Sequence, residues 1–325
     1  MSTKINSKPE SKIPVLVIFA PTASGKTALT RELFSPLGSH FILNAEVISA
    51  DSQAVYKEMD IGTAKPDNTL CAEIPHHLIN LLNPDQQYNV SDFVDAADEA
   101  CLEIYSRGKL PVVCGGTGFY IRNFLYGVAP TPISDEKLRN ELKERIVREG
   151  NEALYSELQK IDPESAAKIH PNDAYRICRA LEVFYLTGQK RSSFKPEDKG
   201  QLRSRYDFLF LVLEPQRDVL YERIRQRVDM MFEAGLEKEV RVLISKGYTK
   251  ETPGMKAIGY SEWFESNNIE EIREAIKHHS CKYAKKQYTY IRDIPGSTVI
   301  DFSASEEDFE KITAVIKQKF TKYFY

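Results

Sequence analysis

A stretch near the start of the chain has the residues of a phosphate-binding loop. Residues 20–27 read APTASGKT, which matches the pattern G-x-x-x-x-G-K-[ST] except that Ala20 replaces the first glycine. Such a loop joins a strand to a helix, and its backbone N–H groups hold an anion at the helix N-terminus. We therefore expect Lys26 to reach a phosphate oxygen and the Thr27 hydroxyl to ligate Mg²⁺.

The loop by itself does not decide what happens to the phosphate. A nucleotidase is expected to carry a second apolar strand that ends in a magnesium-binding acid. Here the corresponding stretch 110–118, LPVVCGGTG, ends in glycines and Thr117. Taken alone, the glycine pair predicts either a tight turn or a close approach of the backbone beside the Thr117 hydroxyl.

The best-placed carboxylate is Asp51, in the stretch VISADSQAVY. It follows an apolar strand, and the carboxyl ends of parallel strands meet at the edge of the sheet where ligands bind. Asp51 would therefore lie beside the phosphate loop, as a general base or a group close to magnesium. The alternative, on position alone, is a helix cap or a turn former.

Two arginines are spaced to meet a diphosphate together. Arg223 and Arg227 are four residues apart in YERIRQR, so they share one face of an expected helix. Guanidinium groups suit phosphate oxygens because their donors form a planar fork. The alternative is a solvated helix on which Asp218 and Glu222 neutralise them.

Two further cationic patterns suit nucleic acid. Arg176 and Arg179 are three residues apart, and the run 282–292, KYAKKQYTYIR, mixes cations with tyrosines. Cations interleaved with aromatic rings suit phosphate contacts together with base stacking, although each run could instead be a solvated face. The pair His76 and His77 has no third ligand at metal spacing, which indicates a structural role.

The elements that must position these residues form an α/β pattern. Four apolar runs predict buried parallel strands, at residues 15–20, 46–51, 110–115 and 207–214. Helical patterns lie between and after them, including residues 91–109, with Ser91 and Gly108 as expected caps, and 270–292. We expect a parallel sheet flanked by helices, like that of P-loop NTPases.

The middle of the chain differs from the rest. Residues 132–199 carry helix signals that end at Gly150 and Gly188, and no convincing strand. We expect a catalytic core from residues 1–131 and 200–325, with 132–199 as a helical insertion.

Composition sets the broad class. The chain has 325 residues, of which 42% are hydrophobic and 28% charged, and a formal net charge of −3; this is ordinary for a globular protein and argues mildly against a generic nucleic-acid binder. Five scattered cysteines indicate neither a disulfide framework nor a zinc site. No apolar run could span a membrane, and the polar start is neither a secretion signal nor a transit peptide, so we expect a cytoplasmic protein.

Together these motifs resemble the tRNA dimethylallyltransferases. The matching stretches run in the family's order from about residue 14 to residue 292: APTASGKT, ISADSQAVYKEMDIGTAKP, PHHLINLLNP, PVVCGGTGFYI, IHPNDAYRICRALEVF and AIGYSEW. The long string DSQAVYKEMDIGTAKP is far more specific than a phosphate loop. Two departures stand out, since Ala20 replaces the usual glycine and Gln53-Ala54 stands where the family often has glutamine at the second position.

The resemblance implies a prenyl transfer in which the loop holds the diphosphate of dimethylallyl diphosphate. The exocyclic N6 of an adenosine next to the anticodon would attack the allylic C1, and diphosphate would leave. That amine is a weak nucleophile, so a base must take its proton as the bond forms, and Asp51 fits this role. The target base must leave its stack to react, and we expect a monomer that uses Mg²⁺.

With the cation patterns above, the resemblance assigns residues to each task. Catalysis falls to Asp51, Thr117 and Arg227. Diphosphate binding falls to Ala20, Pro21, Thr22, Ala23, Ser24, Gly25, Lys26, Thr27 and Arg223. Contacts with tRNA fall to Asp51, Ser52, Gln53, Ala54, Thr117, Arg139, Tyr175, Arg176, Ile177, Cys178, Arg179, Lys282, Lys285 and Lys286.

Three other functions share part of this pattern. A P-loop kinase would use the same loop for phosphoryl transfer, but the long string after Asp51 disfavours it. A prenyltransferase acting on free AMP or ADP would need the same chemistry, but the helical insertion with its paired arginines favours a macromolecular acceptor. An RNA-binding protein with a relict loop is disfavoured because Lys26, Thr27 and Asp51 are intact.

Overall fold

The chain divides into a larger and a smaller compact unit. The computed structural model describes residues 12–196, 201–291 and 294–324. The larger unit comprises residues 1–125 and 203–325, and the smaller one residues 126–202. The polar N-terminal residues 1–11 and Arg292 of the basic run lie outside the described residues.

The larger unit is built on one six-stranded sheet in which all pairings are parallel. Its strand order is β3-β2-β4-β1-β5-β6. The strands are β1 (Ile13–Phe19), β2 (Ala45–Ser49), β3 (His76–His77), β4 (Leu110–Gly115), β5 (Tyr206–Leu213) and β6 (Thr298–Ile300). The predicted parallel α/β sheet is thus confirmed, with the four expected strands at its centre.

Strand β1 is central because its sequence can be buried on both faces. All seven residues of IPVLVIF are buried, and the strand pairs with β4 through Leu16 and Val112 and with β5 through Val17 and Phe210. Two-sided burial of a continuous apolar run is typical of a parallel sheet. The phosphate loop therefore follows a fully buried interior strand of the sheet.

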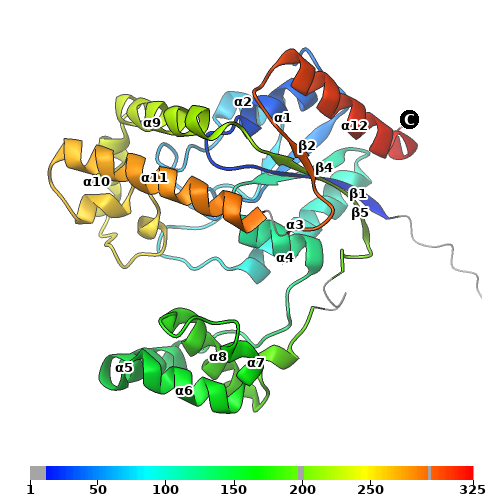
Figure 1. Cartoon of the computed structure of the whole chain (residues 1–325). Coiled ribbons are helices and arrows are strands. Elements are labelled where there is room, and N and C mark those ends of the chain that lie inside the picture. The colour runs from blue at the N-terminus through cyan, green and yellow to red at the C-terminus, as the bar shows by residue number, and fades with distance from the viewer. Residues whose placement is uncertain (1–11, 197–200, 292–293, 325) are drawn as a thin grey trace, which may run out of the picture. The chain divides into compact units, whose positions relative to one another are not determined.

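Helices cover both faces of the sheet, and further helices lie beyond its carboxyl ends (Figure 1). Helices α1 and α12 pack together on one face, while α3 packs against β1, β2 and β4. Helices α9 and α11 pack against each other. The helices of this unit are α1 (Lys26–Phe34), α2 (Asn68–Glu73), α3 (Val90–Ser106), α4 (Gly118–Tyr126), α9 (Arg217–Glu233), α10 (Leu236–Ser245), α11 (Ile269–Ile291) and α12 (Glu306–Phe324), with single 3₁₀ turns at Gly254–Lys256 and Ser261–Phe264.

The expected caps of helix α3 need correction. The N-cap is Asn89, not Ser91, because the Asn89 side chain accepts hydrogen bonds from the backbone N–H groups of Ser91 and Asp92. The Asp92 carboxylate accepts a hydrogen bond from the Asn89 N–H, which completes a capping box. The C-cap is Arg107, and Gly108 follows it with a φ of 72°.

The smaller unit is helical in every described element. It contains α5 (Glu136–Glu149), α6 (Asn151–Ile161), α7 (Pro163–Ala166), α8 (Ala174–Thr187) and a 3₁₀ turn at Arg191–Ser193. Helix α5 ends at Gly150 and α8 ends at Gly188, which adopts the left-handed conformation. Its own apolar cluster includes Leu142, Leu154, Leu158 and Leu181. No helix among the described residues of either unit is long and apolar enough to cross a membrane.

Candidate active site

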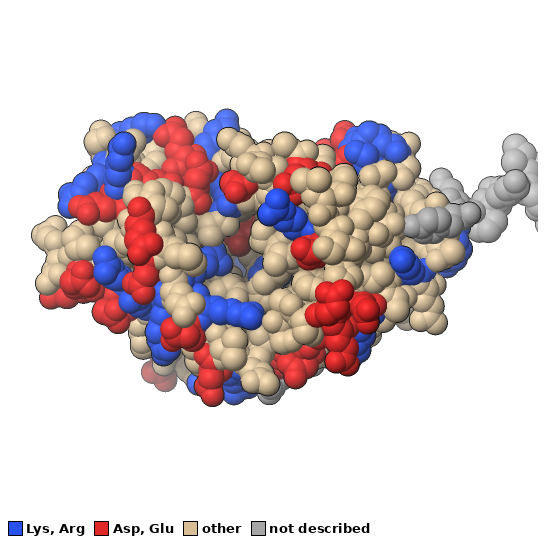
Figure 2. Space-filling model, turned by 90° about the horizontal axis from the view of Figure 1, so that it is seen from above, with Lys and Arg blue, Asp and Glu red and all other residues tan. Residues whose placement is uncertain are grey.

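A cavity of about 820 Å³ opens at the carboxyl ends of the strands in the larger unit. The face seen in Figure 2 is hollowed, with basic side chains within and around the hollow. The charged side chains that line the cavity are Lys26, Lys65, Arg223, Arg227, Lys256 and Asp51. With five cations against one carboxylate, the cavity is suited to an anionic ligand.

The phosphate loop forms one side of the cavity, between β1 and α1. Residues 22–27 line it, and the chain takes a left-handed conformation at Ala23 (φ 60°) and Gly25 (φ 92°). Ala20 is not among the residues with positive φ. Alanine therefore replaces glycine at the first position without backbone strain. Neither Ala20 nor Pro21 lines the cavity; both direct carbonyl oxygens at Lys26.

Lys26 is half-buried at the start of α1. Its Nζ donates to the carbonyl oxygens of Ala20, at 2.9 Å, and Pro21, at 2.7 Å. Burial lowers the pKa of Lys26 to about 8, and Arg227 adds to this effect, while Asp51 opposes it. An anion in the cavity would favour the charged form of this amine.

The two arginines of helix α9 both face the cavity, as their spacing predicted. Arg227 donates from a guanidinium nitrogen to the Thr22 hydroxyl of the phosphate loop, at 2.9 Å. Arg223 lies one turn earlier and makes a long 3.4 Å contact with the carbonyl oxygen of Ser303. Neither arginine pairs with Asp218 or Glu222, so the solvated-helix alternative does not describe them.

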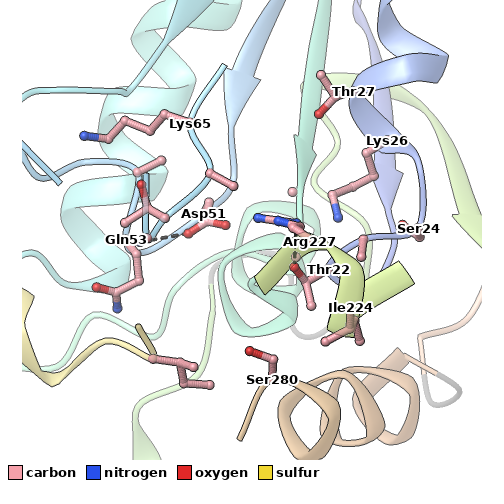
Figure 3. A pocket seen from close by; sticks show the side chains of 18 of the residues that line it. Thr22, Ser24, Lys26, Thr27, Asp51, Gln53, Lys65, Ile224, Arg227 and Ser280 are labelled. Carbon is pink, nitrogen blue, oxygen red and sulfur yellow. Dashed lines mark hydrogen bonds between the residues drawn. The ribbon is translucent and has the colours of Figure 1, made fainter. Parts of the chain in front are cut away.

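Asp51 faces the phosphate loop across the cavity, with Arg227 between them (Figure 3). It follows β2, and its Oδ1 accepts the backbone N–H of Gln53 at 2.9 Å. The turn-forming alternative for Asp51 is thus also true, but one oxygen remains available to a ligand. Ser52, Gln53 and Ala54 line the cavity next to it.

Thr117 is expected to take part in catalysis and to contact tRNA, but the structure gives it hydrogen bonds within the protein. It follows β4, and its Oγ1 accepts the backbone N–H of Ser52 at 3.0 Å. Its own N–H donates to the carbonyl of Ala50 at 3.0 Å. It is not among the residues that line the cavity, so its contacts hold the segment around Asp51.

The cavity offers few ligands for a resident metal ion. The described residues contain no group of three or more His, Cys, Asp or Glu side chains that could hold one. Among the oxygen-bearing groups that line the cavity, Thr27 and Asp51 fit Mg²⁺, which commonly binds one or two protein oxygens and completes its shell with substrate phosphate and water. These residues fit a magnesium ion that arrives with a diphosphate.

Comparisons with known proteins identify the family of the chain. The family model described as IPP transferase matches residues 54–294. The chain is 40% identical over 314 residues to a tRNA dimethylallyltransferase of Geobacter sulfurreducens, which covers 95% of this chain and 98% of the relative. It is also 40% identical over 308 residues to the enzyme of that name from Acetivibrio thermocellus, with 93% and 96% covered. The chain belongs to the tRNA dimethylallyltransferase family.

Solved structures of the family show the same fold. The tRNA isopentenylpyrophosphate transferase of Bacillus halodurans is 35% identical, with a TM-score of 0.67, and covers 96% of this chain and 98% of its own. A eukaryotic dimethylallyltransferase acting on tRNA is 31% identical, with a TM-score of 0.81, and covers 96% of this chain and 80% of its own. The predicted family is confirmed, and with it the assignment of the chain as a transferase enzyme.

In the smaller unit, the predicted tRNA contacts separate into surface and core residues. Tyr175 is 70% exposed, and the Arg176 side chain is 68% exposed. Ile177 and Cys178 are buried in the unit's apolar cluster. This corrects the expectation for these two residues, because buried side chains cannot contact a tRNA in this fold.

Arg139 and Arg179 lie against a buried carboxylate. Arg179 donates to Glu182 at 2.7 Å and to the carbonyl oxygen of Pro132 at 2.6 Å, and Arg139 lies 3.6 Å from Glu182. Burial would raise the pKa of Glu182, but hydrogen bonds from Ser134 and Arg179 outweigh it and hold that pKa below its usual range. Arg179 thus has a structural task in addition to any contact with tRNA.

Within the run 282–292 of helix α11, the residues nearest the site are Gln287 and Tyr283 and not the predicted lysines. Gln287 is buried, and its Oε1 accepts the backbone N–H of Thr22 at 3.1 Å while its Nε2 donates to the carbonyl oxygen of Gly116 at 2.6 Å. It therefore links the phosphate loop to the glycine turn after β4. Tyr283, one turn earlier, lines the cavity; burial, together with the charge of Asp51, raises its pKa to about 12. The predicted lysines Lys282, Lys285 and Lys286 are exposed on the same helix and do not line the cavity.

Proposed function

We propose that this chain transfers a dimethylallyl group from dimethylallyl diphosphate to N6 of the adenosine next to the anticodon of tRNA, and releases diphosphate. The observation that carries the proposal is the shared cavity: the phosphate loop and Asp51 line opposite parts of it, and Arg227 lies between them. Dimethylallyl diphosphate, with its diphosphate on the loop, would place its allylic carbon toward Asp51.

In the proposed reaction the bond between N6 and the allylic C1 forms as the bond between C1 and the diphosphate oxygen breaks. The electron pair of the broken bond leaves with the diphosphate. The proton of the attacking amine moves to the carboxylate of Asp51. The backbone turn from Asp51 to Gln53 fixes the orientation of this carboxylate.

The leaving diphosphate gains negative charge as the bond breaks. Lys26, Arg223, Arg227 and the amides of the phosphate loop would stabilise it, because preorganised donors and charges lower the barrier most where charge develops. Mg²⁺, held by the Thr27 hydroxyl and by diphosphate oxygens, would neutralise further charge when bound. Lys26 would exchange its loop carbonyls for a phosphate oxygen.

The acceptor side of the proposal is a tRNA. The exposed side chains of Tyr175 and Arg176 in the smaller unit, and of Lys282, Lys285 and Lys286 on α11, supply the cations and the aromatic ring that suit RNA. We further propose that the enzyme acts in the cytoplasm as a monomer.

Mass spectrometry of tRNA nucleosides from a strain that lacks the gene tests the proposal. The account predicts that N6-dimethylallyl adenosine and its derivatives disappear from tRNA and return when the gene is restored. A complementing copy with Asp51→Asn should not restore them. Unchanged nucleoside profiles in the deletion strain would refute the proposed function.

A further inference from the structure

One wall of the cavity is a loop held by residues outside the cavity. Residues 62–66 line the cavity, and Lys65 lies on the side of Asp51 that faces away from the phosphate loop (Figure 3). Under the proposed function this wall is on the acceptor side, where the extruded adenosine and its neighbours would enter. The inference below rests on that function.

The start of this loop is fixed by a single carboxylate on helix α10. One oxygen of Glu239 accepts the backbone N–H groups of Asp60 and Ile61, both at 2.9 Å. The other oxygen accepts the N–H of Gly62 at 3.2 Å and the hydroxyl of Tyr260 at 2.6 Å. Three consecutive backbone N–H groups that converge in this way form an anion site, and here the protein fills it with its own side chain.

Packing fixes the loop a second time. A Cβ atom added to Gly62 would lie 2.5 Å from the ring of Tyr260, which is fully buried. Gly62 therefore packs directly against the same tyrosine whose hydroxyl donates to Glu239. Both contacts constrain the backbone of the loop relative to α10.

We propose that Glu239 is a positioning residue that sets the acceptor wall of the cavity. Glu239 is not among the described residues that line the cavity, so it acts through the backbone of residues 60–62. Substitution of Glu239 should change the KM for tRNA and leave the KM for the prenyl donor unchanged. The reason is that the phosphate loop is held separately by Lys26, Arg227 and Gln287.

Two substitutions of Glu239 should differ in a graded way. In Glu239→Gln, the amide oxygen can still accept from Asp60 and Ile61, and the Tyr260 hydroxyl can turn to accept from the amide nitrogen. Only the N–H of Gly62 then loses its partner. In Glu239→Ala, all three backbone N–H groups lose their partner, so the loop should move further.

The test is steady-state kinetics with labelled dimethylallyl diphosphate and unmodified tRNA. Glu239→Ala should raise the KM for tRNA roughly tenfold, because three backbone hydrogen bonds to a charged group are lost, and Glu239→Gln should raise it less. The KM for the prenyl donor should stay within twofold of wild type in both. The matched control is Glu237→Gln on the same helix, which removes only a surface pair with Arg241 and should change neither constant.

A purely structural role gives a different result. A destabilised protein loses active molecules, so kcat falls while both KM values stay unchanged, and that outcome would overturn the proposal. Equal increases in both KM values would overturn it as well.

If Glu239→Ala does not fold, Gly62→Ala displaces the same loop from Tyr260 and should raise the KM for tRNA alone. A wild-type protein that transfers no label to tRNA would refute the proposed function instead, and this arm is measured first.

Discussion

The Nζ atom of Lys26 lies 2.7 Å from the carbonyl oxygen of Pro21, inside the loop that we expect to bind the diphosphate. The amine is thus held in place before a ligand arrives, and burial lowers its pKa to about 8. An amine with this pKa is charged at neutral pH and loses its proton as the pH rises through about 8.

The first prediction concerns the pH dependence of donor use. Lys26 is charged below pH 8 and becomes neutral as the pH rises through 8, so kcat/KM for dimethylallyl diphosphate should fall between pH 7 and pH 9. Lys26→Ala is the control, because this variant should use the prenyl donor poorly at every pH and lack this fall. A wild-type profile that is flat from pH 7 to pH 9 would contradict the assignment.

The second prediction concerns Asp51. Asp51→Asn keeps an Oδ1 that can accept the Gln53 N–H, so the turn should persist while the base is lost. We expect kcat to fall by about 10²–10⁴ with little change in tRNA affinity, measured by single-turnover kinetics and filter binding. Wild-type turnover by this variant at saturating substrates would exclude Asp51 as the base.

A third prediction separates two arginines of the same helix. Arg227→Ala removes a cation from the cavity and should raise the KM for the prenyl donor by at least tenfold, because hydrogen bonds to charged groups contribute about 1.5–3 kcal/mol. Arg225→Ala is the matched control, since Arg225 is exposed and pairs with Glu222. Affinity for tRNA should be unchanged in both variants. Comparable increases in the KM for the prenyl donor in both variants would show that Arg227 has no specific role in binding the donor.

The fourth prediction uses two equally exposed arginines of the smaller unit. The side chains of Arg176 and Arg148 are 68% and 70% exposed. Arg176→Glu should weaken tRNA binding and reduce the slope of log K against log salt by about 0.7, the value of one single-strand phosphate contact. Arg148→Glu should have a much smaller effect. Equal shifts would mean that only the overall charge of the unit matters.

The sequence predicted the parts of the site whose chemistry is local. Lys26, Thr27 and Asp51 each lie within a few residues of a strand end, and a parallel sheet brings such ends to one edge. The strands β3 and β6 escaped prediction because they have two and three residues, too few for a hydrophobic period. Asn89 was missed as a cap because Ser91 is also a good capping residue, and only the backbone decides between them.

The long-range parts of the site could not be predicted from local patterns. Gln287 contacts Thr22 across 265 positions of sequence, and a lone glutamine in a helix has no signal for such a contact. Ile177 and Cys178 lie inside a family motif, but the helical period turns them into the core while Tyr175 and Arg176 face outward. A motif marks a segment, and only the packing of its helix shows which side chains can reach a ligand.

The most direct test of the central claim is the transfer of labelled dimethylallyl groups by the purified protein to two acceptors in parallel. Both acceptors offer the same N6 amine, so Asp51 and the phosphate loop cannot distinguish them. Only binding energy from contacts away from the reacting atoms can favour the larger acceptor. The account predicts rapid labelling of unmodified tRNA and almost none of AMP, ADP or ATP. Efficient labelling of AMP with inert tRNA would contradict it and identify a free-nucleotide prenyltransferase instead.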